Sequence, residues 1–113
     1  MATYSPELAE HVSEVMEDEG LSAWDIERRS CGEVSHMTAR AMAKGVVTNT
    51  DLLVAWAASA YKERTPRERQ YLVERTLAVA GRPWVKYNPD REPAFVTRRV
   101  RLGARIRRAL SLA

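Results

Sequence analysis

Residues 20–45, "GLSAWDIERRSCGEVSHMTARAMAKG", contain the start of one short helix and both ends of another. Ser22 and Ser35 each precede a helical segment, and a serine hydroxyl in that position accepts a hydrogen bond from a first-turn amide. Gly45 suits the left-handed conformation that commonly follows the last helical turn. The stretch therefore predicts a helix over residues 23–29, a turn, and a second helix over residues 36–44.

The same signals predict helices on both sides of this stretch. Ser5 and Pro6 begin a helix, and the segment from Thr65 to Glu68 is a capping box with proline at the first helical position. These outer helices cover residues 6–19, a segment that begins at Thr48 or Thr50 and includes Ala60, and residues 66–80. Five short helices with brief connections are thus predicted within residues 1–81, and the predicted fold class is all-α.

Charge divides the chain into two parts. Residues 1–81 carry nine Lys/Arg against thirteen Asp/Glu, whereas residues 82–113 carry nine against two. A strongly basic segment is typical of proteins that bind a polyanion such as nucleic acid, although it can also be a solvated helix face. We therefore expect a helical domain over residues 1–81, followed by a linker and a basic C-terminal helix over residues 82–113.

Length and apolar patterning limit the classes of protein that the chain can be. At 113 residues it has room for about one domain. Its longest uncharged apolar run, residues 52–61, is much shorter than the roughly 20 residues that span a bilayer, and its first 20 residues are acidic, unlike a signal peptide. These features predict a soluble, cytoplasmic protein without a membrane partner.

The sequence offers no set of residues for catalysis or metal binding. One cysteine and two scattered histidines are a poor set of metal ligands, and Cys31 is expected to be a small packing residue. His11 and His36 lie on different predicted helices, without an evident carboxylate or nucleophile beside either. We expect no enzymatic activity, no cofactor, no metal and no small-molecule ligand.

The predicted helix over residues 36–44 has a narrow apolar face. Ala39 and Met42 lie on its inward side, while the opposite side carries His36, Met37, Arg40 and Lys44, with Thr38 and Ala41 at the edges. The hydrophobic periodicity alone fits a solvated amphipathic helix at least as well as a helix that recognises DNA bases. Donors beside a methyl-bearing surface also fit the DNA major groove, where base edges present acceptors and the thymine methyl group.

The order of these features resembles the lambda-repressor and Cro family of helix-turn-helix proteins, also called Xre-type. The resemblance rests on "GLSAWDIERRSCGEVSHMTARAMAKGVVTNTDLLVAWAASA", residues 20–60, and extends over about residues 5–62. The interval from Ser35 to Gly45 equals the family's interval between the cap and the closing glycine of the recognition helix. The residues that fall where the family places caps and core positions are Ser22, Ile26, Ser35, Met42, Gly45, Leu53, Trp56 and Ala57. The turn "SCGEVS" is about two residues longer than usual, so the angle between the two helices can differ from the family's.

The resemblance implies a five-helix lambda-repressor-like helix-turn-helix domain that binds double-stranded DNA in a sequence-specific manner. The base-reading residues that it implies are His36, Met37, Thr38, Arg40 and Ala41. The residues that it places at the DNA backbone are Ser22, Ala23, Trp24, Ser35, Lys44, Thr48 and Asn49. The function that follows is transcriptional regulation, most simply repression by occupying an operator, as in a temperate-phage immunity repressor that maintains lysogeny.

The segment beyond residue 81 is interpreted separately. Trp84 and Tyr87 lie in a proline-broken linker, as buried anchors or as stacking surfaces. A helix is predicted from Ala94, and its apolar stripe contains Val96, Val100, Ile106 and Leu110. Its arginines are Arg98, Arg99, Arg101, Arg105, Arg107 and Arg108. The arginines favour additional DNA contacts, and the apolar stripe favours packing or a homodimer. A helix at a membrane surface, which would use both features, is the least favoured alternative.

Two alternatives remain open from the sequence. The same fold occurs in modules that hold a partner protein, such as an antitoxin-like or polymerase-binding protein. A monomer on an asymmetric site is an alternative to a dimer on two half-sites.

Overall fold

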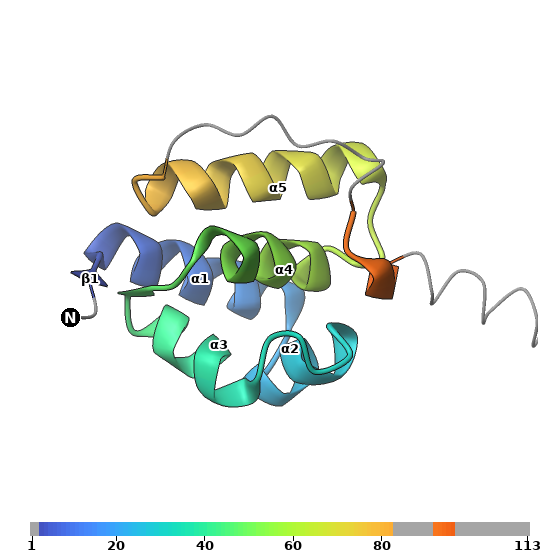
Figure 1. Ribbon diagram of the computed structural model, residues 1–113, viewed down its shortest axis with the longest axis horizontal. Coiled ribbons are helices and arrows are strands. Elements are labelled where there is room, and N and C mark those ends of the chain that lie inside the picture. The colour runs from blue at the N-terminus through green and yellow to red at the C-terminus, as the bar shows by residue number, and fades with distance from the viewer. Residues whose placement is uncertain (1–2, 83–91, 97–113) are drawn as a thin grey trace, which may run out of the picture.

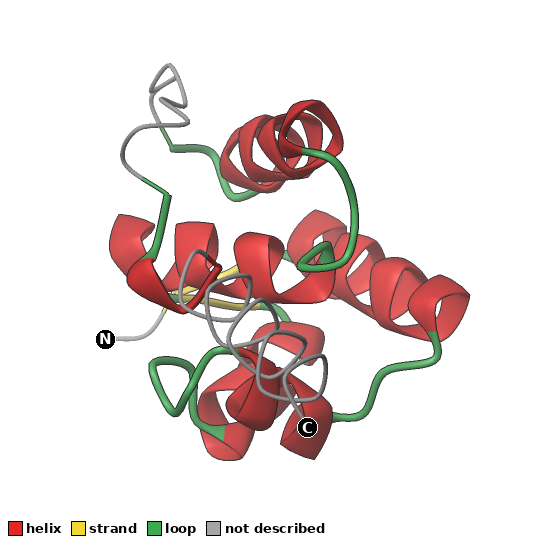
Figure 2. Ribbon diagram, turned by 90° about the vertical axis from the view of Figure 1, so that its right-hand side faces the viewer, coloured by secondary structure: helices red, strands yellow, loops and turns green. Residues whose placement is uncertain are grey.

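The computed structural model describes residues 3–82 and 92–96, and these residues are mostly helical. The elements in chain order are β1 (Thr3–Tyr4), α1 (Pro6–Glu19), α2 (Ala23–Arg29), α3 (His36–Ala43), β2 (Val46–Val47), α4 (Thr50–Ala60) and α5 (Pro66–Val79). In Figure 1, α5 lies along the top, α1 and α4 lie in the middle, and α2 and α3 lie below them. Figure 2 shows the same three levels from the side. The mainly helical character predicted from the sequence is confirmed.

Side-chain caps define where most of the helices begin. Ser22 and Asp25 form a complete capping box at α2, and Thr65 forms one with Glu68 at α5. The hydroxyl of Ser35 accepts a hydrogen bond from the Thr38 amide at 3.1 Å, at the start of α3. Each cap satisfies an amide that has no partner within its own helix, which is why these boundaries follow from the sequence.

Helix α4 begins at one of its two predicted starts, but its cap was not predicted. Helix α4 begins at Thr50, and its cap is Asn49, whose Oδ1 accepts a hydrogen bond from the Leu52 amide at 2.8 Å. The Thr48 hydroxyl is buried instead of capping the helix. Asparagine and threonine both cap helices well, so the sequence pattern "TNT" did not determine which residue would do so.

Helix α4 is the most deeply buried element. Leu53, Trp56, Ala57 and Ala60, which helical spacing places on one face, are buried. Ala55, Ala58 and Ser59 are buried as well, so the helix is enclosed on most of its circumference. A helix that is apolar nearly all round belongs to the core. Its alanines let the neighbouring helices approach closely.

A short antiparallel pairing, which the sequence did not predict, joins the start of the described chain to the end of α3. Thr3 pairs with Val47 and Tyr4 with Val46, and the Ser5 amide donates a 2.8 Å hydrogen bond to the Gly45 carbonyl. Gly45 has a φ of +98°, and a Cβ there would lie 2.7 Å from the Ser5 carbonyl oxygen. Gly45 is therefore required both by its backbone conformation and by the close approach of the chain.

The turn between α2 and α3 is held by Ser30, which is buried. Its hydroxyl accepts a 3.0 Å hydrogen bond from the Val34 amide and lies 3.2 Å from the Glu27 carbonyl oxygen, to which it can donate. Cys31, with a φ of +53°, lies on the outside of this turn and is exposed. The expectation that Cys31 is a packing residue was wrong, because it is exposed in this turn.

Residues 92–96 pack onto the helical body, at the end of the molecule where α4 finishes (orange in Figure 1). Arg69 and Glu92 form an ion pair at 2.8 Å, with side chains only 8% and 12% exposed. Phe95 and Val96 are buried, and the Lys62 ammonium lies 5.5 Å from the centre of the Phe95 ring. This part of the predicted C-terminal segment thus contributes to the core. Within the described residues, no helix is long and apolar enough to cross a membrane.

Candidate nucleic-acid interface

Helix α3 is held on one side and open on the other. Ala39 and Met42 are fully buried, as its predicted inward face requires, and the helix packs against α1 and α2. On the opposite side Met37 is 70% exposed, and Arg40 and Lys44 are exposed as well. Neither cation has an ion pair or hydrogen-bonded side-chain partner among residues 3–82 and 92–96. Both are therefore free to meet an anion or a base edge.

His36, predicted to be a base reader, is engaged with α2. Its ring stacks on the Trp24 ring, with centroids 3.6 Å apart and planes 15° from parallel. Its Nδ1 lies 3.2 Å from Glu27 Oε1, and its backbone amide donates to the same oxygen at 3.2 Å. These two hydrogen bonds from His36, the side-chain one first, hold the pKa of the Glu27 carboxyl below its usual value. The expectation that no carboxylate lies beside His36 was therefore wrong, because a carboxylate from α2 reaches the start of α3, which the pattern of α3 alone could not reveal.

Three smaller side chains complete the first turns of α3. The Ser35 hydroxyl donates to the Thr38 hydroxyl at 3.0 Å and accepts from the Thr38 backbone amide, so Ser35 is bonded to both the side chain and the main chain of Thr38. Ser35, Thr38 and Ala41 are all half-buried. Of the five predicted base readers, Met37 and Arg40 are the exposed ones, and His36, Thr38 and Ala41 are partly covered.

The start of α2 was predicted to receive a DNA phosphate. In the structure the Ser22 amide and hydroxyl both donate to Asp25 Oδ2, at 2.8 and 2.9 Å. Asp25 is also paired with Arg28, and the hydrogen bonds from Ser22, the backbone one first, lower the pKa of its carboxyl. The donors of Ser22 are therefore occupied by a carboxylate. Ala23 is half-buried, while Trp24 is 50% exposed.

A pocket of about 450 Å³ lies between α1, α2 and α3. Its lining is mostly apolar and includes Met16, Ala23, Trp24 and Ala39, and Arg40 lies at the same site. Sequence reasoning missed this pocket because its walls come from three helices whose relative placement is tertiary. It makes the surface around Arg40 concave.

The loop after α3 is less accessible than predicted at Thr48 and open at Asn49. The Thr48 hydroxyl is buried without a hydrogen-bond partner, and its carbonyl accepts from Arg82 Nη2 at 2.7 Å. Asn49 is exposed, with its side-chain oxygen committed to the cap of α4. Thr48 is thus part of the packing between this loop and Arg82.

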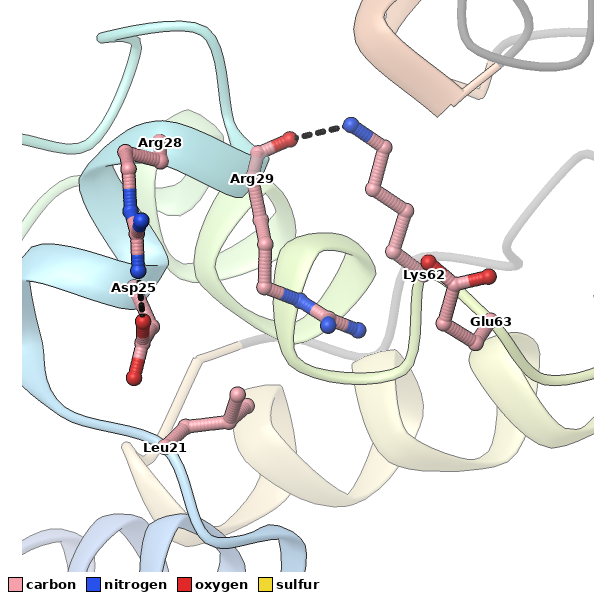
Figure 3. A pocket seen from close by; sticks show the side chains of 6 residues that line it. All are labelled: Leu21, Asp25, Arg28, Arg29, Lys62 and Glu63. Carbon is pink, nitrogen blue, oxygen red and sulfur yellow. Dashed lines mark hydrogen bonds and ion pairs between the residues drawn. The ribbon is translucent and has the colours of Figure 1, made fainter. Parts of the chain in front are cut away.

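A second pocket, of about 370 Å³, lies beside the C-terminal end of α2 (Figure 3). It is lined by Leu21, Asp25, Arg28, Arg29, Lys62 and Glu63. Arg29 Nε donates to the Ser59 carbonyl at 2.7 Å, and Lys62 Nζ donates to the Arg29 carbonyl at 2.7 Å. These two bonds tie the ends of α2 and α4 together, so they stabilise the position of α2 beneath α4.

The remaining predicted contacts fall on other parts of the chain. Trp84, Tyr87 and the six arginines from Arg98 to Arg108 lie outside the described residues. Within the described ranges, 3–82 and 92–96, no group of three or more His, Cys, Asp or Glu side chains could hold a metal ion.

No protein-family model, curated protein or solved structure matches the chain.

Proposed function

We propose that the protein is a sequence-specific double-stranded-DNA-binding regulator with a lambda-repressor-like helix-turn-helix fold, in which α2 and α3 form the motif. One observation carries the proposal. Helix α3 is buried through Ala39 and Met42, while its opposite face presents Arg40 and Lys44 without carboxylate partners among the described residues. An anchored helix with unpaired cations on its open face is suited to the major groove of DNA, which is a polyanion.

Each exposed residue of α3 has a role in this proposal. The Arg40 guanidinium can donate two parallel hydrogen bonds to the O6 and N7 atoms of guanine. Met37 can contact a thymine methyl group, and Lys44, at the end of the helix, can contact a phosphate. Binding to an operator would repress transcription by excluding polymerase, with no chemistry on the DNA.

Positive charge from outside the helical body supports the same proposal. Residues 1–81 carry four more acidic than basic residues, so this body alone would be repelled by DNA at long range. Residues 97–113 contain six arginines and no acidic residue. In the proposed function these arginines add phosphate contacts, and binding weakens steeply with salt because counterions are released.

Selection of bound sequences from random double-stranded DNA tests the proposal. The wild-type protein should enrich one motif, and Arg40→Ala should lose preference at one or two positions by about 1–3 kcal/mol. Arg67→Ala is the matched control, because Arg67 on α5 is also exposed and has no hydrogen bond or ion pair among the described residues. A chain that ends after Val96 should bind all sequences more weakly, with a flatter salt dependence. Enrichment of no motif by the wild type would refute the proposal.

The concave surface between α1, α2 and α3 favours a second candidate, in which the same face holds a partner protein. The exposed side chains of Trp24 and Met37 and the apolar pocket beside Arg40 are suited to such a contact. This candidate predicts that Trp24→Ala weakens partner binding, and that the wild type shows no sequence preference on DNA.

A further inference from the structure

Glu27 makes contacts that set the start of α3. One of its carboxylate oxygens, Oε1, accepts from the His36 amide and lies against His36 Nδ1, each at 3.2 Å. Trp24, one turn earlier on α2, covers the face of the same ring at a centroid distance of 3.6 Å. Two residues of α2 therefore hold one residue of α3, one at the edge of its ring and the other at its face.

These contacts decide which nitrogen of His36 carries the proton when the ring is neutral. An ionised carboxylate can only accept hydrogen bonds, so Nδ1 must be the donor in its contact with Glu27. A neutral imidazole has one N–H, which leaves Nε2 with a lone pair. Nε2 makes no hydrogen bond among the described residues, nor is it one of their buried unpartnered atoms, so it is open to solvent.

On the DNA-binding function proposed above, we propose that Glu27 fixes the proton of His36 on Nδ1, so that Nε2 accepts a hydrogen bond from a base amino group. The amino groups exposed in the major groove are adenine N6 and cytosine N4. Glu27 is a positioning residue in this arrangement, because it acts on the base through His36. His36, at the start of α3, thereby accepts a hydrogen bond from a base. Arg40, one turn later, instead donates hydrogen bonds to acceptor atoms of a base.

The location of Glu27 supports a positioning role over a role in stability alone. A single carboxylate oxygen satisfies an otherwise unpaired amide at the α3 N-terminus and also fixes the ring, across a turn of six residues, 30–35. The stacked Trp24 ring removes the remaining freedom of the imidazole plane. A ring held at edge and face presents its other nitrogen in one direction, as a specific hydrogen bond requires.

The first test is made on the free protein and does not depend on DNA. Long-range proton–nitrogen NMR spectra at pH 8, assigned with His36→Gln, report which ring nitrogen of His36 is protonated. We expect the Nδ1–H tautomer in the wild type and a shift toward Nε2–H in Glu27→Gln, whose neutral amide still accepts from the His36 backbone. A wild-type ring protonated on Nε2 would overturn the proposal.

The second test compares the DNA motifs selected by Glu27→Gln and Glu33→Gln at pH 8. Glu33 is the matched control, since it is exposed in the same turn and its side chain makes no hydrogen bond or ion pair among the described residues. Both substitutions remove one negative charge, so both should raise affinity for all sequences alike. Only Glu27→Gln should also weaken the preference for adenine or cytosine at one position, by about fivefold. This decrease corresponds to the loss of about one hydrogen bond.

The outcomes separate the two proposals. Identical motifs for Glu27→Gln and Glu33→Gln would overturn the base contact while leaving the DNA-binding function intact. No motif for the wild type would overturn the DNA-binding function and with it the base contact, and the NMR result would still decide whether Glu27 sets the tautomer of His36.

Discussion

Replacing Gly45 with alanine tests the tight junction between α1 and the end of α3. Gly45 has a φ of +98°, where an L-residue costs about 1–2 kcal/mol. The new Cβ would also lie 2.7 Å from the Ser5 carbonyl oxygen, closer than such atoms approach, and the neighbour is backbone that cannot rotate away. The backbone at Ser5 must move to make room for this Cβ. That movement strains the 2.8 Å hydrogen bond from the Ser5 amide to the Gly45 carbonyl and the 3.1 Å bond from the Ala9 amide to the Ser5 carbonyl. Each bond that breaks costs about 1 kcal/mol.

We therefore expect Gly45→Ala to lower the free energy of unfolding by about 2–4 kcal/mol. Gly20→Ala is the matched control, because Gly20 has a φ of +65° and a Cβ added there would meet no atom within 4 Å. Gly20→Ala should cost only the conformational part, about 1–2 kcal/mol. Urea denaturation followed by circular dichroism measures both values. Equal losses for the two variants would show that the close approach at Ser5 contributes nothing to stability.

Two further predictions concern groups within the helical body. Burial, and secondarily the charge of Arg75, lower the pKa of His11. As the pH falls, His11 therefore takes up a proton in the unfolded chain at a higher pH than in the folded chain, so stability should decrease below about pH 6.5. Urea denaturation from pH 8 to pH 5 should show a shallower decline in His11→Gln, and the same slope in both proteins would contradict this explanation. Arg69→Met removes the partner of Glu92 and leaves two backbone carbonyls without their donor, and should cost about 2–4 kcal/mol. Arg67→Met, at an exposed position on the same helix, should cost less than about 0.5 kcal/mol, and similar losses for the two variants would rule out a stabilising role for the Arg69–Glu92 pair.

The helices could be predicted from the sequence because their signals are local. The Ser22 and Ser35 caps act on amides three residues away, so the residues that form each helix start are neighbours in the chain. The buried pair Ala39 and Met42 likewise follows from the helical period. Asn49 was missed as the cap of α4 because Thr48 and Thr50, on either side of it, have a similar capping ability. Local reasoning cannot separate the three residues.

The contacts that shape the candidate site were beyond such reasoning. Glu27 and His36 are nine residues apart and on different helices, and they meet only because the turn after Ser30 folds back. Arg69 and Glu92 are separated by 23 residues, and their pairing depends on how the segment after α5 returns to the body. Long-range pairs of this kind depend on the relative placement of elements, which neither periodicity nor capping encodes.

The enclosed alanines of α4 also limit how this chain can vary. Ala55, Ala57, Ala58 and Ala60 are buried where α4 packs against its neighbouring helices, and a methyl group is all that each of them places there. A larger side chain at any of them must displace a neighbouring helix, typically at a cost of about 1–3 kcal/mol. Glycine requires no such displacement but costs about 1 kcal/mol in a helix interior. Substitutions at these four alanines should therefore lower stability whether the side chain grows or shrinks, while the open face of α3 can change in size and charge without disturbing the packing of the helices.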